Sequence, residues 1–147
     1  MIDDEKRLEF VLSAVELAFN MRDAGLSKTS YSRVLRETIF FVWEIRKFEK
    51  HSPLRERSQA AVGLPKNQVD YDHAIPMQIV IGKLLEAWPN REEVVNIVRN
   101  MVHGVIITKH EHAHLRQIGL NSRMPQGWDG NVWTARFDAA GIALASR

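Results

Sequence analysis

The spacing of apolar residues changes at one point of this chain, the turn-forming segment 63–67 (Gly-Leu-Pro-Lys-Asn). Before it, apolar residues recur every three or four positions, which predicts helices over residues 3–21 and about 29–50. After it, short runs rich in β-branched residues alternate with helical stretches. We therefore expect an α+β, mostly helical fold. An N-terminal helical lobe, residues 1–65, would pack on a small ββα-like unit with a helical insert, residues 66–147; one compact domain is the alternative.

Capping residues locate further elements on both sides of the break. Ser52 followed by Pro53 predicts a short helix to about Val62, because proline is favoured at the first helical position. Residues 68–75 are predicted to form a strand that ends at Pro76, since the residue before a proline favours extended geometry. The insert is then expected as two helices, the first from Met77 to Trp88 and the second opened by Asn90 and Glu93.

The segment after the insert predicts a strand that turns directly into a helix. Residues 104–107 are a compact β-branched run, typical of a strand. Thr108 and Glu111 have the spacing of a capping box, which indicates a helix that ends near Gly119. Pro125 and the glycines around it make 121–131 a loop, and a last helix is expected over 132–140.

Composition excludes several classes of protein. The 147 residues contain no cysteine, so a disulfide scaffold and a thiolate zinc finger are excluded. Lys and Arg number 20 against 18 Asp and Glu, a formal net charge of +2 that argues against a general polyelectrolyte binder. No apolar run approaches the ~20 residues needed to cross a bilayer, and the acidic start is unlike a signal peptide. We expect a soluble, cytoplasmic protein without a membrane partner.

The histidines are concentrated in one part of the chain. Only His51 of the six lies outside residues 73–114. Two local patterns flank the expected insert there: Asp-His-Ala-Ile-Pro at 72–76 and the strand-to-helix segment 103–112 with its histidine cluster. Together they predict the order strand, insert, strand, helix, with a carboxylate–histidine pair on the first strand.

This arrangement resembles the HNH branch of the His-Me finger (ββα-metal) nucleases, in a divergent or degenerate form. The resemblance covers about residues 71–116 and implies metal-dependent hydrolysis of phosphodiesters in a nucleic acid. By position, His73 would be the general base, and His103 would stand where the family has the asparagine that orients the base. Asp72 and His112 would hold a divalent metal ion.

The metal expected at such a site follows from its ligands. One carboxylate and one imidazole suit Mg²⁺ or Mn²⁺, whereas a site of two or three histidines favours Zn²⁺ or Ni²⁺. His110 and His114 stand four residues apart, on one helical face, and are the alternative ligand pair. A simpler interpretation makes His73 a core or turn histidine and the others part of an exposed, polar helix start.

Several cationic and aromatic residues are candidates for contacting nucleic acid. Lys109 and Arg116, in the helix expected after Thr108, would contact phosphates. Arg123 and Trp128 lie in the loop 121–131, where Trp128 either stacks on a base or closes the core. A basic stretch could follow a phosphate backbone, although interleaved glutamates dilute it. That stretch comprises Arg46, Lys47, Lys50, His51, Arg55 and Arg57.

Two functions from different classes are therefore open on the sequence. One is metal-dependent phosphodiester hydrolysis on an HNH-like scaffold, or nucleic-acid binding by a descendant that has lost the chemistry. The other is a non-enzymatic phage or bacterial regulatory or inhibitor protein that binds a protein partner through its helical lobe and the Trp128 loop. Whether the chain is an enzyme depends on a divalent metal at Asp72 and His73.

Overall fold

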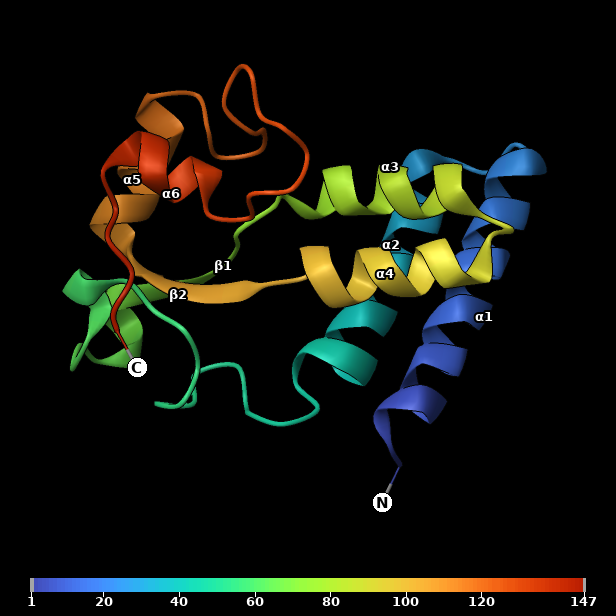
Figure 1. Ribbon diagram of the computed structural model, residues 1–147, viewed down its shortest axis with the longest axis horizontal. Coiled ribbons are helices and arrows are strands. Elements are labelled where there is room, and N and C mark those ends of the chain that lie inside the picture. The colour runs from blue at the N-terminus through green and yellow to red at the C-terminus, as the bar shows by residue number, and fades with distance from the viewer. Residues whose placement is uncertain (1, 147) are drawn as a thin grey trace. The chain divides into compact units, whose positions relative to one another are not determined.

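The computed structural model describes residues 2–146, and the contacts among them form two compact units (Figure 1). Unit 1 consists of the chain up to Lys47 together with Met77–Asn100, and unit 2 consists of Phe48–Pro76 together with the chain from Met101 onward. The break at residues 63–67 lies inside unit 2. The two helices expected as an insert of the second unit make their contacts within unit 1 instead.

Unit 1 is helical, and its helices start at the residues whose side chains can cap them. The Asp3 side chain accepts a hydrogen bond from the Lys6 amide at 2.8 Å, and the Asn90 side chain accepts one from Glu93 at 3.0 Å. The elements are α1 (Asp4–Asp23), α2 (Lys28–Thr38), the π-helix η1 (Ile39–Glu44), α3 (Met77–Ala87) and α4 (Arg91–Met101).

The core of unit 1 is built from one face of each helix. The apolar side chains of this core are almost completely buried. Removing the apolar stripe of each helix from water is what stabilises such helices. The helix expected to reach residue 50 ends earlier, because α2 continues only as η1 and the chain then turns. The largest fully buried side chains of this core are Val11, Val15, Leu35, Ile39, Val80 and Leu84.

Unit 2 contains an antiparallel two-stranded sheet followed by a helix. The strands β1 (Val69–His73) and β2 (Gly104–Thr108) pair so that His73 lies opposite Gly104 and Val69 opposite Thr108. Helix α5 (Lys109–Gln117) follows β2 directly through the predicted Thr108–Glu111 capping box, in which both hydrogen bonds are 2.9 Å. The mostly helical α+β fold, with this ββα order, is confirmed.

The prediction of a helix from Ser52 to Val62 is wrong. Residues 56–58 instead run beside the free edge of β2: the Ser58 amide donates to the Ile106 carbonyl and the Ile106 amide donates to the Glu56 carbonyl, both at 2.9 Å. Backbone groups paired in this way are not available for helical bonds. Only the short 3₁₀ helix η2 (Gln59–Ala61) forms, followed by η3 (Lys66–Gln68).

The sheet separates two apolar clusters in unit 2. Helices α5 and α6 (Ala135–Ala140) cover one side, where Val105, Ile107, Leu115 and Phe137 are buried (Figure 1). Helix α6 is shorter than expected and ends at Gly141, whose φ of 71° is left-handed. The other side packs Ile106 with Val69 and Ala61 of η2. Neighbouring residues of β1 therefore face different surroundings.

Candidate nucleic-acid interface

The pleat of β1 sends its functional side chains to opposite sides of the sheet. Asp70 and Asp72 share the side of α5 and α6, whereas Tyr71 and His73 share the other. The general base and the metal ligand that the HNH resemblance assigns to consecutive positions, His73 and Asp72, thus lie in different environments in this strand.

Asp72 is paired with a buried arginine. The Arg136 side chain is 0% exposed, and its Nη1 donates to Asp72 Oδ2 at 3.0 Å and to the His73 carbonyl at 2.7 Å. Its Nε also donates to the Leu120 carbonyl at 2.6 Å. The carboxylate expected to hold a metal ion already has a cation beside it. Nothing in the local sequence indicated this partner, because Arg136 lies 64 residues away.

His112, the second expected metal ligand, pairs with Asp70 rather than with Asp72. Its Nδ1 lies 2.9 Å from Asp70 Oδ2, and Lys109 Nζ donates to Asp70 Oδ1 at 3.1 Å. The hydrogen bond from His112 and then Lys109 hold the pKa of Asp70 below its ordinary 3.8, against a smaller opposing effect of burial. Sequence analysis missed Asp70, although its place two residues before Asp72 was a signal that both acids share one side of a strand.

The remaining histidines of α5 do not join this pair in a ligand set. His110 is exposed, His114 is half-buried, and Arg116 is exposed on the same helix. Throughout residues 2–146, no three His, Asp or Glu side chains are close enough to one another to hold a metal ion.

His73 and His103 contact aromatic rings. The His73 ring meets the Tyr71 ring edge to face, with 5.4 Å between centroids. His103 stacks on Trp133 with centroids 4.4 Å apart and ring planes 16° from parallel. The two residues to which the resemblance assigns catalytic roles therefore each contact an aromatic ring. The sequence did not indicate that Trp133 stacks on His103.

Cations gather around Tyr71, on the side of β1 that carries His73. The Arg55 guanidinium lies 5.1 Å and the Lys50 ammonium 5.8 Å from the centre of the Tyr71 ring. Gly104 lets the Tyr71 ring come close to the backbone of β2, because a Cβ there would overlap the tyrosine hydroxyl. Part of the basic stretch in the sequence is thus placed on an aromatic platform that the sequence did not reveal.

The pKa of His51 is lowered, in part by positive charges of the same region. Partial burial and the neighbouring Lys66, Lys50, Arg55 and Arg57 lower its pKa from the ordinary 6.5. We call these five residues, Lys50, His51, Arg55, Arg57 and Lys66, the basic cluster. Lys66 is its one member that sequence analysis did not single out, since it lies beyond the basic stretch, in η3.

The loop residues Arg123 and Trp128 are bonded within their own segment. Arg123 Nε donates to the Gly119 carbonyl at 2.7 Å, and Trp128 Nε1 donates to the Val132 carbonyl at 2.9 Å. Asp129 accepts from the amides of Asn131 and Val132, and these bonds lower its pKa. Arg123 is exposed and Trp128 half-buried, and these hydrogen bonds tie both side chains to the loop itself.

Comparisons with protein-family models, with curated proteins and with solved structures find no match to this chain. The HNH resemblance therefore stays a prediction. None of the helices within residues 2–146 is both long and apolar enough to span a membrane. Function has to be inferred from the side chains that the fold brings together.

Proposed function

We propose that this protein binds nucleic acid, with the basic cluster of unit 2 contacting phosphates and the HNH-like ββα unit serving as the scaffold. The supporting observation is the placement of the Arg55 and Lys50 cations over the Tyr71 ring. Partial burial together with four cations, these two among them, lowers the pKa of His51. Cations held against an aromatic ring next to a strand make a preformed site for an anionic backbone.

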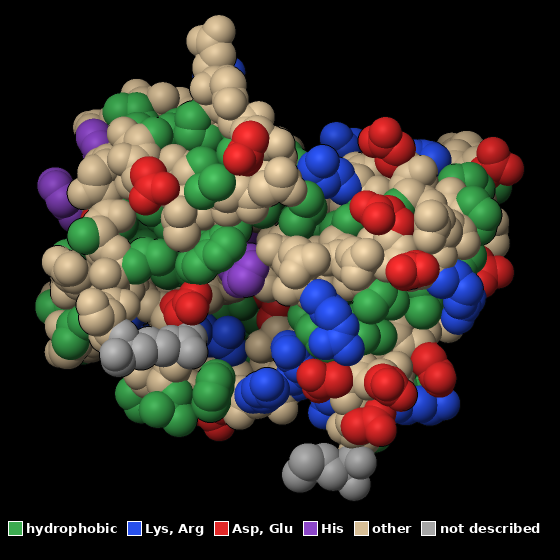
Figure 2. Space-filling model, in the orientation of Figure 1, with side chains coloured by type: hydrophobic (Ala, Val, Ile, Leu, Met, Phe, Trp, Pro, Cys, Tyr) green, Lys and Arg blue, Asp and Glu red, His purple; other side chains and the backbone are tan. Residues whose placement is uncertain are grey.

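The positive charge of this region is local. Acidic and basic side chains are interleaved over the part of the surface formed by α1–α4 (Figure 2), and the whole chain carries only +2. A protein with this balance contacts few phosphates, so its affinity should fall moderately with salt. Each phosphate contact to a single strand contributes about −0.7 to the slope of log affinity against log salt.

Metal-dependent phosphodiester hydrolysis is the second candidate. The observation that favours it is the position of His73, whose ring touches Tyr71 on the side where phosphates would bind. In that proposal His73 is the base, and Asp72 with His112, or the pair His110 and His114, would hold the metal ion. The Arg136 guanidinium against Asp72 speaks against a cation at that carboxylate, which is why we favour binding without cleavage.

Binding can be measured by fluorescence anisotropy with labelled single-stranded DNA, duplex DNA and single-stranded RNA at about 50–200 mM salt, the range in which phosphate contacts respond strongly. Lys50→Ala/Lys66→Ala should weaken binding and reduce the salt slope, for each phosphate that is no longer neutralised, by about 0.7 on single strands and about 0.9 on duplex DNA. The matched control is Lys6→Ala/Lys28→Ala, which removes the same charge from exposed positions of unit 1. Equal affinities for the two double variants would refute the phosphate site.

The hydrolytic candidate is tested on the same oligonucleotides with Mg²⁺, Mn²⁺, Zn²⁺ and Ni²⁺. We expect no cleavage by the wild-type protein. Metal-dependent cleavage that His73→Ala abolishes, in a variant that keeps its folded circular dichroism spectrum, would replace our proposal with the nuclease. An affinity for nucleic acid that changes neither with the lysine substitutions nor with salt concentration would instead favour a protein partner as the ligand.

A further inference from the structure

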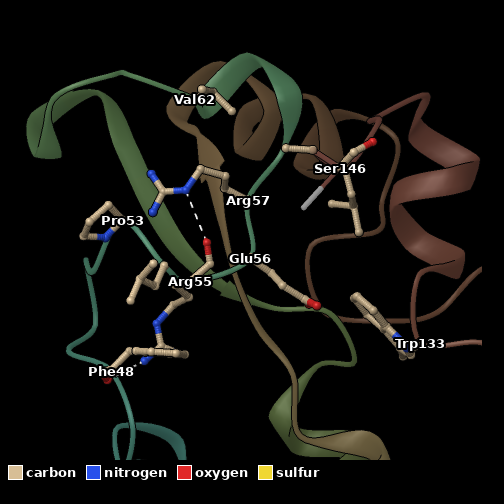
Figure 3. A pocket seen from close by; sticks show the side chains of 11 residues that line it. Phe48, Pro53, Arg55, Glu56, Arg57, Val62, Trp133 and Ser146 are labelled. Atoms are coloured by element: carbon tan, nitrogen blue, oxygen red, sulfur yellow. Dashed lines mark hydrogen bonds between the residues drawn. The ribbon is translucent and has the colours of Figure 1, made fainter.

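A pocket of about 610 Å³ opens next to the basic cluster and shares Arg55 and Arg57 with it. Its walls come from the segment before η2, from Trp133 and from the C-terminal segment at Leu144 (Figure 3). All of these belong to unit 2. The volume lies within the range typical of sites for small organic molecules, about 300–1,000 Å³.

The pocket has two chemically different ends. Arg55 and Arg57 lie at one end, and at the other the Glu56 side chain points toward Trp133 (Figure 3). The arginines are anchored by backbone oxygens: Arg57 Nη2 donates to the Ser52 carbonyl at 2.7 Å, and Arg55 Nη2 donates to the Phe48 carbonyl at 2.8 Å. Their charges are therefore held at that end in advance of any ligand.

Trp133 presents a fixed aromatic surface to the pocket. Its indole stacks on His103, 4.4 Å away and nearly parallel, while the same side chain lines the pocket. Apolar side chains also line the pocket, among them Phe48, Leu54 and Val62. A matching ligand has a planar ring at one end, hydrogen-bond donors on that ring, and negative charge at the other end.

We propose that the pocket receives one nucleotide of a single-stranded nucleic acid. The base packs against Trp133, its exocyclic amino group donates to Glu56, and its phosphate lies toward Arg55 and Arg57. This inference rests on the proposed nucleic-acid binding and adds its substrate class. A duplex is excluded from the pocket because a base can reach Trp133 only after leaving its stack, whereas unstacked bases pack readily on aromatic side chains.

The test compares single-stranded oligo-dC, oligo-dA and oligo-dT with a duplex, for Trp133→Leu and for the matched control Trp88→Leu, at a half-buried tryptophan of unit 1. Trp133→Leu should weaken single-strand binding about tenfold, as expected for the loss of one stacked base, and change duplex binding less than about twofold. Trp88→Leu should change neither. Equal losses on single strands and duplex, no loss at all, or a loss with Trp88→Leu alone would overturn the proposal.

Glu56→Met supplies a second test should Trp133→Leu fail to fold, because it keeps a side chain of similar length and removes the hydrogen-bond acceptor. The wild-type protein should prefer oligo-dC and oligo-dA, whose bases carry amino groups, over oligo-dT, and Glu56→Met should remove this preference. An unchanged preference overturns the pocket assignment. The lysine variants distinguish the two proposals. If Lys50→Ala/Lys66→Ala weakens binding while the pocket variants do not, phosphate binding by the basic cluster is supported and the nucleotide pocket is refuted.

Discussion

Arg136 and Asp72 form a buried ion pair that joins the C-terminal helix of unit 2 to its first strand, with Arg136 Nη1 3.0 Å from Asp72 Oδ2. The same guanidinium also donates to backbone carbonyls, among them those of His73, Ala74 and Leu120. It places a permanent cation beside the carboxylate at which the local sequence led us to expect a metal ion.

Removal of this guanidinium should destabilise the protein. Arg136→Met is expected to lower the free energy of unfolding by about 3–5 kcal/mol, because Asp72 would keep a nearly buried charge without a partner. Asp72→Asn should cost less, about 1–2 kcal/mol, since Arg136 retains its carbonyl acceptors. Urea denaturation followed by circular dichroism measures both.

The double variant Arg136→Met/Asp72→Asn provides the control for this prediction. It should be more stable than Arg136→Met alone, because the uncompensated charge has been removed. If the double variant is instead as unstable as the sum of the two single variants, the ion pair is not the cause.

Asp70 should make stability dependent on pH in the acid range. Because its pKa is held below the ordinary 3.8 in the folded state, its contribution is present above that value and is lost as the pH falls through the folded pKa. Asp70→Asn should therefore lower the free energy of unfolding by about 1 kcal/mol at pH 7 and by progressively less below about pH 4. Urea unfolding at a series of pH values gives this difference. A difference that stays constant down to about pH 2 would show that the carboxylate charge is not involved.

A side chain at position 104 should destabilise the protein while Tyr71 is present. Gly104→Ala places a methyl group where the tyrosine ring lies, so the ring must move, at a cost of about 1–3 kcal/mol. In a Tyr71→Thr background the same substitution should cost much less. A thermodynamic cycle of the four proteins measures the coupling, and strict additivity would contradict the close approach of these residues.

His51 should respond to its cationic neighbours and to bound phosphate. Lys66→Ala should raise the pKa of His51, because one of the charges that oppose its protonation is gone. A bound oligonucleotide should raise this pKa too, so affinity should increase as the pH falls from about 8 to 6. Nuclear magnetic resonance titration of the histidine ring protons, with His51→Gln for assignment, tests both.

The matched control for this titration is Lys28→Ala, in unit 1. It removes an equal charge and should leave the His51 titration unchanged. A similar upward shift with Lys28→Ala would mean that His51 senses net charge rather than the basic cluster.

Interactions between residues close in the chain were predictable. Thr108 and Glu111 form the capping box that their spacing indicated, and Asp3 caps the first helix. The strand beginning at Gly104 was also expected from its β-branched residues. Each of these depends on partners within one helical turn or on the intrinsic preference of a short run, which a sequence displays directly.

A distant partner competes with a local signal at two places in the chain. Ser52 followed by Pro53 is a good helix start, but the predicted helix does not form because the backbone of 56–58 pairs with Ile106. The HNH resemblance groups His112 with Asp72, whereas in the folded chain the His112 ring is hydrogen-bonded to Asp70. In both cases the decisive hydrogen bond joins residues far apart in the chain, so no local pattern records it.

The mostly helical α+β class, the capped helix ends and the order strand, helices, strand, helix follow from short-range periodicity and backbone preference, so the amino-acid order alone is enough to predict them. The chemistry of the candidate site depends on tertiary structure. Tertiary structure put Arg136 against Asp72, brought Arg55 and Lys50 over the Tyr71 ring, and set Trp133 beside Glu56 and Arg57 in one pocket. Charge and stacking act between groups that are close in space, and only the folded chain determines which groups those are.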